Sequence, residues 1–113
     1  MEEKRKHARA PLSVLLEIWT KEKQKSVGKG FITNLSEDGL ALETTERLKL
    51  SDNFVLSFTL PNNWTFDIWG EIIYIKEGIL TKAYGIHFKT VAPETRVQIK
   101  HYVKACLELK QCY

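Results

Sequence analysis

The chain contains few of the residues that cross-link or interrupt a fold. Its 113 residues include 2 cysteines, 1 methionine, 3 prolines and 6 glycines. Prolines and glycines this sparse and scattered exclude a collagen-like or low-complexity chain and indicate an ordinary globular one. Cys106 and Cys112 lie near the C-terminus, and because we expect an intracellular chain we also expect reduced thiols rather than a disulfide.

Long apolar runs are also missing. The longest uncharged stretch, residues 53–66, contains Pro61, Asn62 and Asn63 and is too short and too interrupted to span a bilayer. A secretory signal would need an apolar stretch soon after the basic N-terminus, whereas strand-like alternation and the charged segment TKEKQK follow there. The sequence therefore predicts a cytoplasmic protein with no membrane insertion.

Arginine is scarce, and its placement is uneven. Among 17 basic residues the arginines are Arg5, Arg9, Arg47 and Arg96. Half of them fall within the segment RKHAR, residues 5–9, in a chain whose net charge is only +3. The N-terminal segment is therefore expected to attract anions locally, in a chain whose positive and negative charges otherwise nearly cancel.

Period-two alternation of apolar residues predicts about six β-strands. They are expected at residues 12–19, 26–35, 40–45, 54–60, 64–75 and 79–90. Short turns between them favour a barrel or a closed sandwich, because closure removes exposed strand edges. The period changes after Pro93, which suits the first turn of a helix. An apolar stripe there predicts a C-terminal helix with its buried face formed by Ile99, Tyr102, Val103, Cys106 and Leu107.

A second motif, NLSEDG, follows the second predicted strand. Asn34 and Ser36 suit a turn held by side-chain hydrogen bonds, and Gly39 can adopt the positive φ that a tight turn often requires. The first two strands form a hairpin about a turn at residues 21–23, so residues whose numbers sum to about 43 to 45 should lie opposite each other. This pairing brings the arginine segment close to Asn34 and Ser36.

Two guanidinium groups, an amide and a hydroxyl would then converge at one end of the sheet. Guanidinium forks bind phosphate bidentately, bind guanine O6 and N7 in the same manner, and stack on base faces, which lysine cannot do. The constellation is therefore typical of a site for an anionic ligand that carries a purine.

These motifs resemble the signature of the PilZ domain, a bacterial receptor for the second messenger cyclic di-GMP. Segment 5–9 matches the RxxxR part of the signature, and segment 34–39 matches [D/N]xSxxG. Segment 84–88, YGIHF, is similar to the last strand of the family. The resemblance covers nearly the whole chain.

The resemblance implies an all-β fold, a six-stranded antiparallel β-barrel with a C-terminal α-helix. The expected organisation is a single domain over residues 1–113, with a flexible arginine loop at residues 1–11, the barrel at residues 12–90 and the helix at residues 92–111. Ligand binding would order the arginine loop and change a surface that regulates a downstream protein, in motility, secretion or polysaccharide machinery.

The resemblance also implies the roles of individual residues. Arg5 and Arg9 would contact phosphates and guanine bases, Asn34 and Ser36 would hydrogen-bond a guanine, and Gly39 would permit the turn. Asn34 stands where many members carry aspartate, so a neutral oxygen would face the guanine N1 and N2 donors. No cofactor is implied apart from the ligand, cyclic di-GMP.

Other interpretations stay open at this stage. A PilZ-type adaptor would act through protein contacts without nucleotide, although both arginines argue against it. A barrel that binds RNA or single-stranded DNA would need more than a net charge of +3, so we expect no nucleic-acid partner. The residues His101, Cys106 and Cys112 match no usual zinc spacing, and no motif sets a nucleophile beside a histidine. We therefore predict neither a metal site nor an enzyme.

Overall fold

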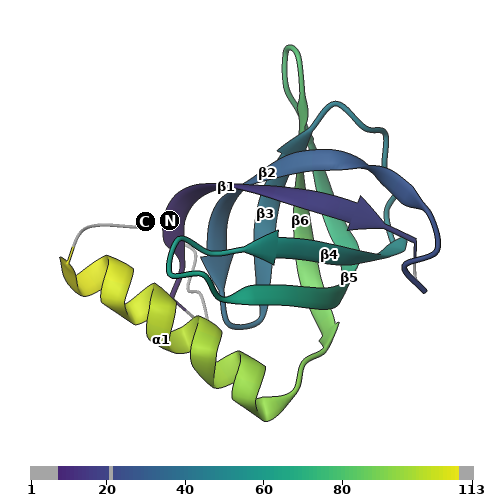
Figure 1. The fold of residues 1–113 in the computed structure, drawn as a ribbon. Helices are drawn as coiled ribbons and strands as arrows, with labels where there is room; N and C mark the ends of the chain where they lie inside the picture. The colour runs from purple at the N-terminus through teal and green to yellow at the C-terminus, as the bar shows by residue number, and fades with distance from the viewer. Residues whose placement is uncertain (1–7, 21, 110–113) are drawn as a thin grey trace.

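A computed structural model describes residues 8–20 and 22–109 of the chain. Its elements in chain order are β1 (Ala10–Trp19), β2 (Ser26–Ser36), β3 (Gly39–Thr44), β4 (Asn53–Thr59), β5 (Thr65–Glu77), β6 (Lys82–Thr90) and α1 (Pro93–Leu109). All neighbouring strands pair antiparallel, and the order β1-β2-β3-β6-β5-β4 closes into a barrel (Figure 1). The predicted six-stranded antiparallel barrel with a C-terminal helix is confirmed, and the closed sandwich is not formed.

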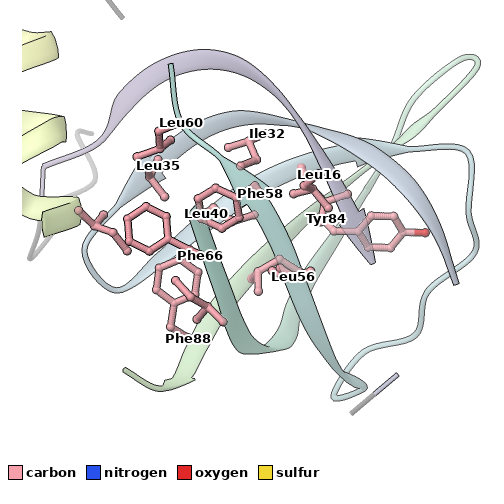
Figure 2. Packing of buried hydrophobic residues seen from close by; sticks show 14 of the residues in the cluster. Leu16, Ile32, Leu35, Leu40, Leu56, Phe58, Leu60, Phe66, Tyr84 and Phe88 are labelled. Atoms are coloured by element: carbon pink, nitrogen blue, oxygen red, sulfur yellow. The ribbon is translucent and has the colours of Figure 1, made fainter. Parts of the chain in front are cut away.

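The core fills the interior of this barrel. Inward-facing residues alternate with outward-facing ones along each strand, as in β6, where Tyr84, Ile86 and Phe88 are buried while His87 is exposed. Figure 2 shows the packing of Leu16, Ile32, Leu35, Leu40, Leu56, Phe58, Leu60, Phe66, Tyr84 and Phe88. The alternation that predicted the strands therefore also predicted which side chains form the core.

Helix α1 lies against one end of the barrel, where it contacts β1 and β2 (Figure 1). Its buried residues are Ile99, Tyr102, Val103 and Cys106. Leu107, which the sequence placed in the same stripe, is 43% exposed because it lies at the margin of the face that meets the barrel. Cys106 is a buried free thiol, and Cys112 lies outside the described residues, as do residues 110 and 111 of the predicted helix.

The other end of the barrel is held by the buried side chain of Tyr84. Its hydroxyl donates to the carbonyl oxygen of Glu46 over 2.9 Å and accepts from the Leu48 amide over 3.0 Å. Both partners belong to the connection between β3 and β4, so one core residue fastens this connection to the barrel. Figure 2 places Tyr84 away from the helix.

The β1–β2 hairpin has nearly the predicted register. Ala10 pairs with Leu35 and Pro11 with Asn34, and an irregularity between Pro11 and Val14 shifts the following pairs by one residue. Strand β1 begins at Ala10 rather than at Leu12, so the start of this strand lies directly beside the NLSEDG motif. Within the two described ranges, no helix is both long enough and apolar enough to cross a bilayer.

Candidate ligand-binding site

A row of residues lies in register across the outer face of four strands. Asn34 of β2 pairs with Ala41 of β3, Ala41 pairs with Gly85 of β6, and Gly85 pairs with Tyr74 of β5. A Cβ atom on Gly85 would overlap the Tyr74 ring, so this ring lies directly over the β6 backbone. Between Asn34 and Tyr74 the sheet therefore carries only a methyl group and a bare glycine.

A second row runs beside the first. Ser36 of β2 pairs with Gly39 of β3, Gly39 with His87 of β6, and His87 with Glu71 of β5. Glu71 is held in an ion pair with Lys89 at 3.2 Å. The two rows together form what we call the candidate face, which has small residues in its centre and polar or aromatic side chains on both sides.

Gly39 is required by the fold for a reason that the sequence did not show. The expectation was a positive φ, but among the described glycines only Gly28 has one. Gly39 lies at the start of β3, where an added Cβ would overlap the carbonyl oxygen of Ile86 on β6. The close approach of two strands, rather than a left-handed backbone, therefore excludes a side chain at this position.

Ser36 is buried and already hydrogen-bonded within the β2–β3 turn. Its Oγ lies 2.5 Å from Asp38 Oδ1 and 3.2 Å from the Gly39 carbonyl oxygen, and the Asp38 amide lies 3.4 Å from the same Oγ. The predicted ligand residue therefore first of all shapes the turn, as serine commonly does in this position.

Asn34 differs from Ser36 in one respect. Its side-chain oxygen Oδ1 is buried and has no hydrogen-bond partner among the described residues. The facing residue on β1 is Pro11, which has no backbone N–H to donate. A buried acceptor without a donor costs about 1–3 kcal/mol, so a ligand N–H group that reached this oxygen would recover that cost.

Arg9 borders the same face. A small hollow of about 40 Å³ is lined by Arg9, Asp38, Gly39, Leu40, Ile73, Tyr74, Gly85, Ile86 and His87. The structure thus brings Arg9 to Gly39, and Asn34 and Ser36 occupy the adjoining strand. Arg5 lies outside the described residues. The hollow is too small for a nucleotide, so a ligand here would lie across the face rather than inside a cavity.

Sequence patterns did not single out Tyr74 or His87 as site residues. Tyr74 follows an irregularity in β5, between Ile72 and Tyr74, so the period-two alternation does not reveal that its ring reaches Gly85. Tyr74 is 41% exposed and His87 is exposed. Both become visible only when the order of β3, β6 and β5 around the barrel is known.

The opposite part of the sheet, over β4 and β5, holds a polar cluster of another kind. Asp67 accepts a hydrogen bond from Ser57 and lies 3.2 Å from the ammonium group of Lys23. The Ser57 hydrogen bond lowers the pKa of Asp67, Lys23 adds to the effect, and partial burial opposes it. Nowhere in residues 8–20 and 22–109 do three or more metal-ligating side chains gather.

The fold and the candidate face define the class of protein. It is a small closed barrel of antiparallel strands with a C-terminal helix at one end and a candidate site on the outside of the sheet. The family model described as the PilZ domain matches residues 3–105, and the chain belongs to this family. The suspected resemblance is thereby confirmed.

Solved structures with low sequence identity share the fold. The PilZ domain of Escherichia coli YcgR with c-di-GMP is 14% identical, with a TM-score of 0.76 over 96% of this chain and 99% of that one. Bacillus subtilis MotI (DgrA), an inhibitor of motility, is 13% identical, with a TM-score of 0.84 over 97% of this chain and 54% of that one.

A third structure, the K. pneumonia MrkH–c-di-GMP complex, is 15% identical, with a TM-score of 0.77 over 96% of this chain and 54% of that one. This chain therefore spans about half the length of the MotI and MrkH chains. No curated protein matches it in sequence.

Proposed function

We propose that this protein is a receptor for cyclic di-GMP and that the nucleotide lies across the candidate face. The observation that carries the proposal is the buried Oδ1 of Asn34, which has no partner in residues 8–20 and 22–109 and lies on the face that Arg9 borders. The family membership and the two c-di-GMP-bound relatives, YcgR and MrkH, support the choice of ligand.

The residues of the face divide the recognition of such a ligand between them. Arg9, together with Arg5, supplies guanidinium forks for phosphates and for guanine O6 and N7. Asn34 Oδ1 accepts from guanine N1–H and N2–H, because no residue that the structure describes donates to this oxygen. Ser36 and Gly39 hold the β2–β3 turn that positions Asn34.

Tyr74 extends the proposed site to the far side of the face. Its ring lies over Gly85 and is partly open to solvent, which leaves a π-surface against which a base can stack. Stacking of a base on an aromatic ring contributes about 1–3 kcal/mol. Ala41 and Gly85 are the residues that pair between Asn34 and Tyr74, so a base stacked on Tyr74 would lie on the same face as Asn34.

The proposed mechanism contains no chemical step. The arginine segment that precedes β1 folds over the nucleotide, and the altered surface binds or releases a downstream protein, as a disorder-to-order switch does. The protein therefore acts as a receptor and effector and not as an enzyme. Its domain organisation is proposed to be a single PilZ domain over residues 1–113, acting in the cytoplasm.

Isothermal titration calorimetry with cyclic di-GMP, and with GTP as the competing purine nucleotide, tests the proposal. We expect saturable binding of cyclic di-GMP alone, and loss of that binding in the double variant Arg5→Ala, Arg9→Ala. The matched control is Arg47→Ala, Arg96→Ala, which removes the same charge elsewhere and should bind like the natural sequence. A folded protein that releases no heat would overturn the proposal and favour the PilZ-type adaptor.

A further inference from the structure

His87 is a titratable side chain on the candidate face, and the proposed function gives it no role so far. It lies on the outside of β6 and is exposed. In register it pairs with Gly39 of β3 on one side and with Glu71 of β5 on the other. Gly39 has no side chain that could cover the imidazole. A ligand that lies across the face can therefore reach His87.

The two carboxylates beside His87 are engaged with other residues. Glu71 Oε1 lies 3.2 Å from the ammonium group of Lys89. Asp38 borders the same hollow as His87, and its Oδ1 accepts a hydrogen bond from Ser36 Oγ. Among the described residues the imidazole of His87 has no hydrogen bond or ion pair. None of these residues therefore occupies its ring nitrogens.

The hollow that Arg9 and His87 border is suited to a single ligand atom. Its volume of about 40 Å³ has room for about one water molecule or one oxygen atom. The guanidinium group of Arg9 is a charged donor, and a protonated histidine donates from both ring nitrogens. An anionic oxygen in the hollow would accept from both residues in charge-assisted hydrogen bonds. A phosphodiester supplies such an oxygen.

The protonation state of His87 decides the local charge of this part of the face. The titratable groups around it come from the β2–β3 turn, the segment before β1, β5 and its own strand, and they are Asp38, Arg9, Glu71, Tyr74 and Lys89. The two carboxylates and the two cations among them cancel, and the phenol is neutral. Histidine is the side chain that ordinarily changes its charge between about pH 5 and pH 8. This part of the face is therefore neutral or positive according to the pH.

We propose that His87 is a phosphate-binding residue of the candidate face and that its protonation strengthens the binding of cyclic di-GMP as the pH falls. The inference rests on the proposed function, because it assigns a further residue to the same site. A bound anion favours the protonated imidazole, and by reciprocity the proton favours binding of the anion. The phosphodiesters and guanines of the ligand keep their charge in this range, so the dependence comes from the protein.

Calorimetric titration with cyclic di-GMP at several values between about pH 5 and pH 8 tests the proposal. The affinity of the natural sequence should rise about tenfold toward the acid end, the equivalent of one charge-assisted hydrogen bond. His87→Gln should bind with the weaker affinity at every pH, because glutamine donates a hydrogen bond but carries no charge. His87→Lys should keep the tighter affinity throughout, because lysine stays charged over the whole range.

The other two histidines of the chain provide matched controls. His7 belongs to the arginine segment of the sequence, and His101 lies on α1. His7→Gln and His101→Gln each remove one group that titrates in the same range, and the pH dependence should persist in both variants. A dependence that disappeared in either control, or that survived in His87→Gln, would overturn the proposal.

The same titrations separate this inference from the proposed function. Cyclic di-GMP that binds the natural sequence equally well at every pH would overturn the role of His87 and leave the receptor in place. A folded protein that binds no cyclic di-GMP at any pH would overturn the receptor itself. Because His87 is exposed, neither substitution at this position should change the urea midpoint.

Discussion

Two polar clusters on the outside of the barrel differ in how their hydrogen bonds are completed. Over β4 and β5, Ser57, Asp67 and Lys23 satisfy one another within the chain. On the candidate face, Asn34 keeps a buried acceptor that no described residue satisfies. The first cluster is complete within the described residues, whereas the second keeps an acceptor to which none of them donates.

The comparison separates stability from binding. Polar groups that are paired within the chain should affect unfolding when they are changed, and should leave ligand affinity alone. Changing a polar group that has no partner among the described residues should lower ligand affinity and leave unfolding nearly unchanged, because no native hydrogen bond is lost. The following variants test this division.

The largest effect is expected at Arg9. Each charge-assisted hydrogen bond contributes about 1.5–3 kcal/mol, so Arg9→Ala should weaken cyclic di-GMP binding about 100-fold in calorimetric titration. Arg9→Lys should recover little of this loss, because lysine keeps the charge but not the planar fork. Arg96→Ala is the matched control, and an equal loss there would show that only net charge matters.

Gly39→Ala comes next, and it tests whether this glycine serves the fold or the ligand. The new methyl group would overlap the carbonyl oxygen of Ile86, and overpacking of this kind costs about 1–3 kcal/mol. We expect the urea midpoint to fall without ligand present. Unchanged stability together with lost binding would assign Gly39 to the ligand instead.

Asn34→Ala should weaken binding about tenfold, the equivalent of one hydrogen bond, with little change in the free energy of unfolding. Its counterpart on the other cluster is Ser57→Ala, which should lower stability slightly and leave the affinity for cyclic di-GMP unchanged. Both are measured by the same pair of experiments, urea unfolding and calorimetry. If Asn34→Ala destabilised the protein more than Ser57→Ala, the division would be wrong.

The smallest effect is expected from the ionisation of Asp67. Because its pKa is lowered below the ordinary 3.8, the carboxylate stabilises the fold above that pH, and the contribution is lost as the pH falls through the lowered value. The side chain is half exposed, so Asp67→Asn should cost less than about 1 kcal/mol at neutral pH. The difference between the two proteins should vanish in acid, and a difference that persisted there would exclude the charge as its cause.

The barrel could be predicted because each strand carries its own alternation, as in Tyr84, Ile86 and Phe88. The order of the strands around the barrel could not, since β3 pairs with β6 across more than thirty intervening residues. The hairpin register brought Arg9 toward Asn34 from numbering alone, because Pro11 and Asn34 do pair.

The rest of the candidate site depends on that strand order. Tyr74 reaches the face only because β5 pairs with β6 and an irregularity precedes it. The positive φ expected at Gly39 is not observed, because the constraint on this residue comes from Ile86 on a distant strand rather than from the local turn. Local patterns thus reveal residues that share a hairpin and miss those that meet through barrel closure.

The contact between Gly39 and Ile86 also bears on how signature motifs are used to classify protein sequences. A residue demanded by the spacing of two strands serves the barrel whether or not a nucleotide binds. Its presence in a sequence is therefore evidence for the fold and not for binding of the ligand. A sequence search that aims to separate chains that bind the nucleotide from chains that share only the fold should give weight to the arginines and to the position of Asn34. It should give none to the glycine.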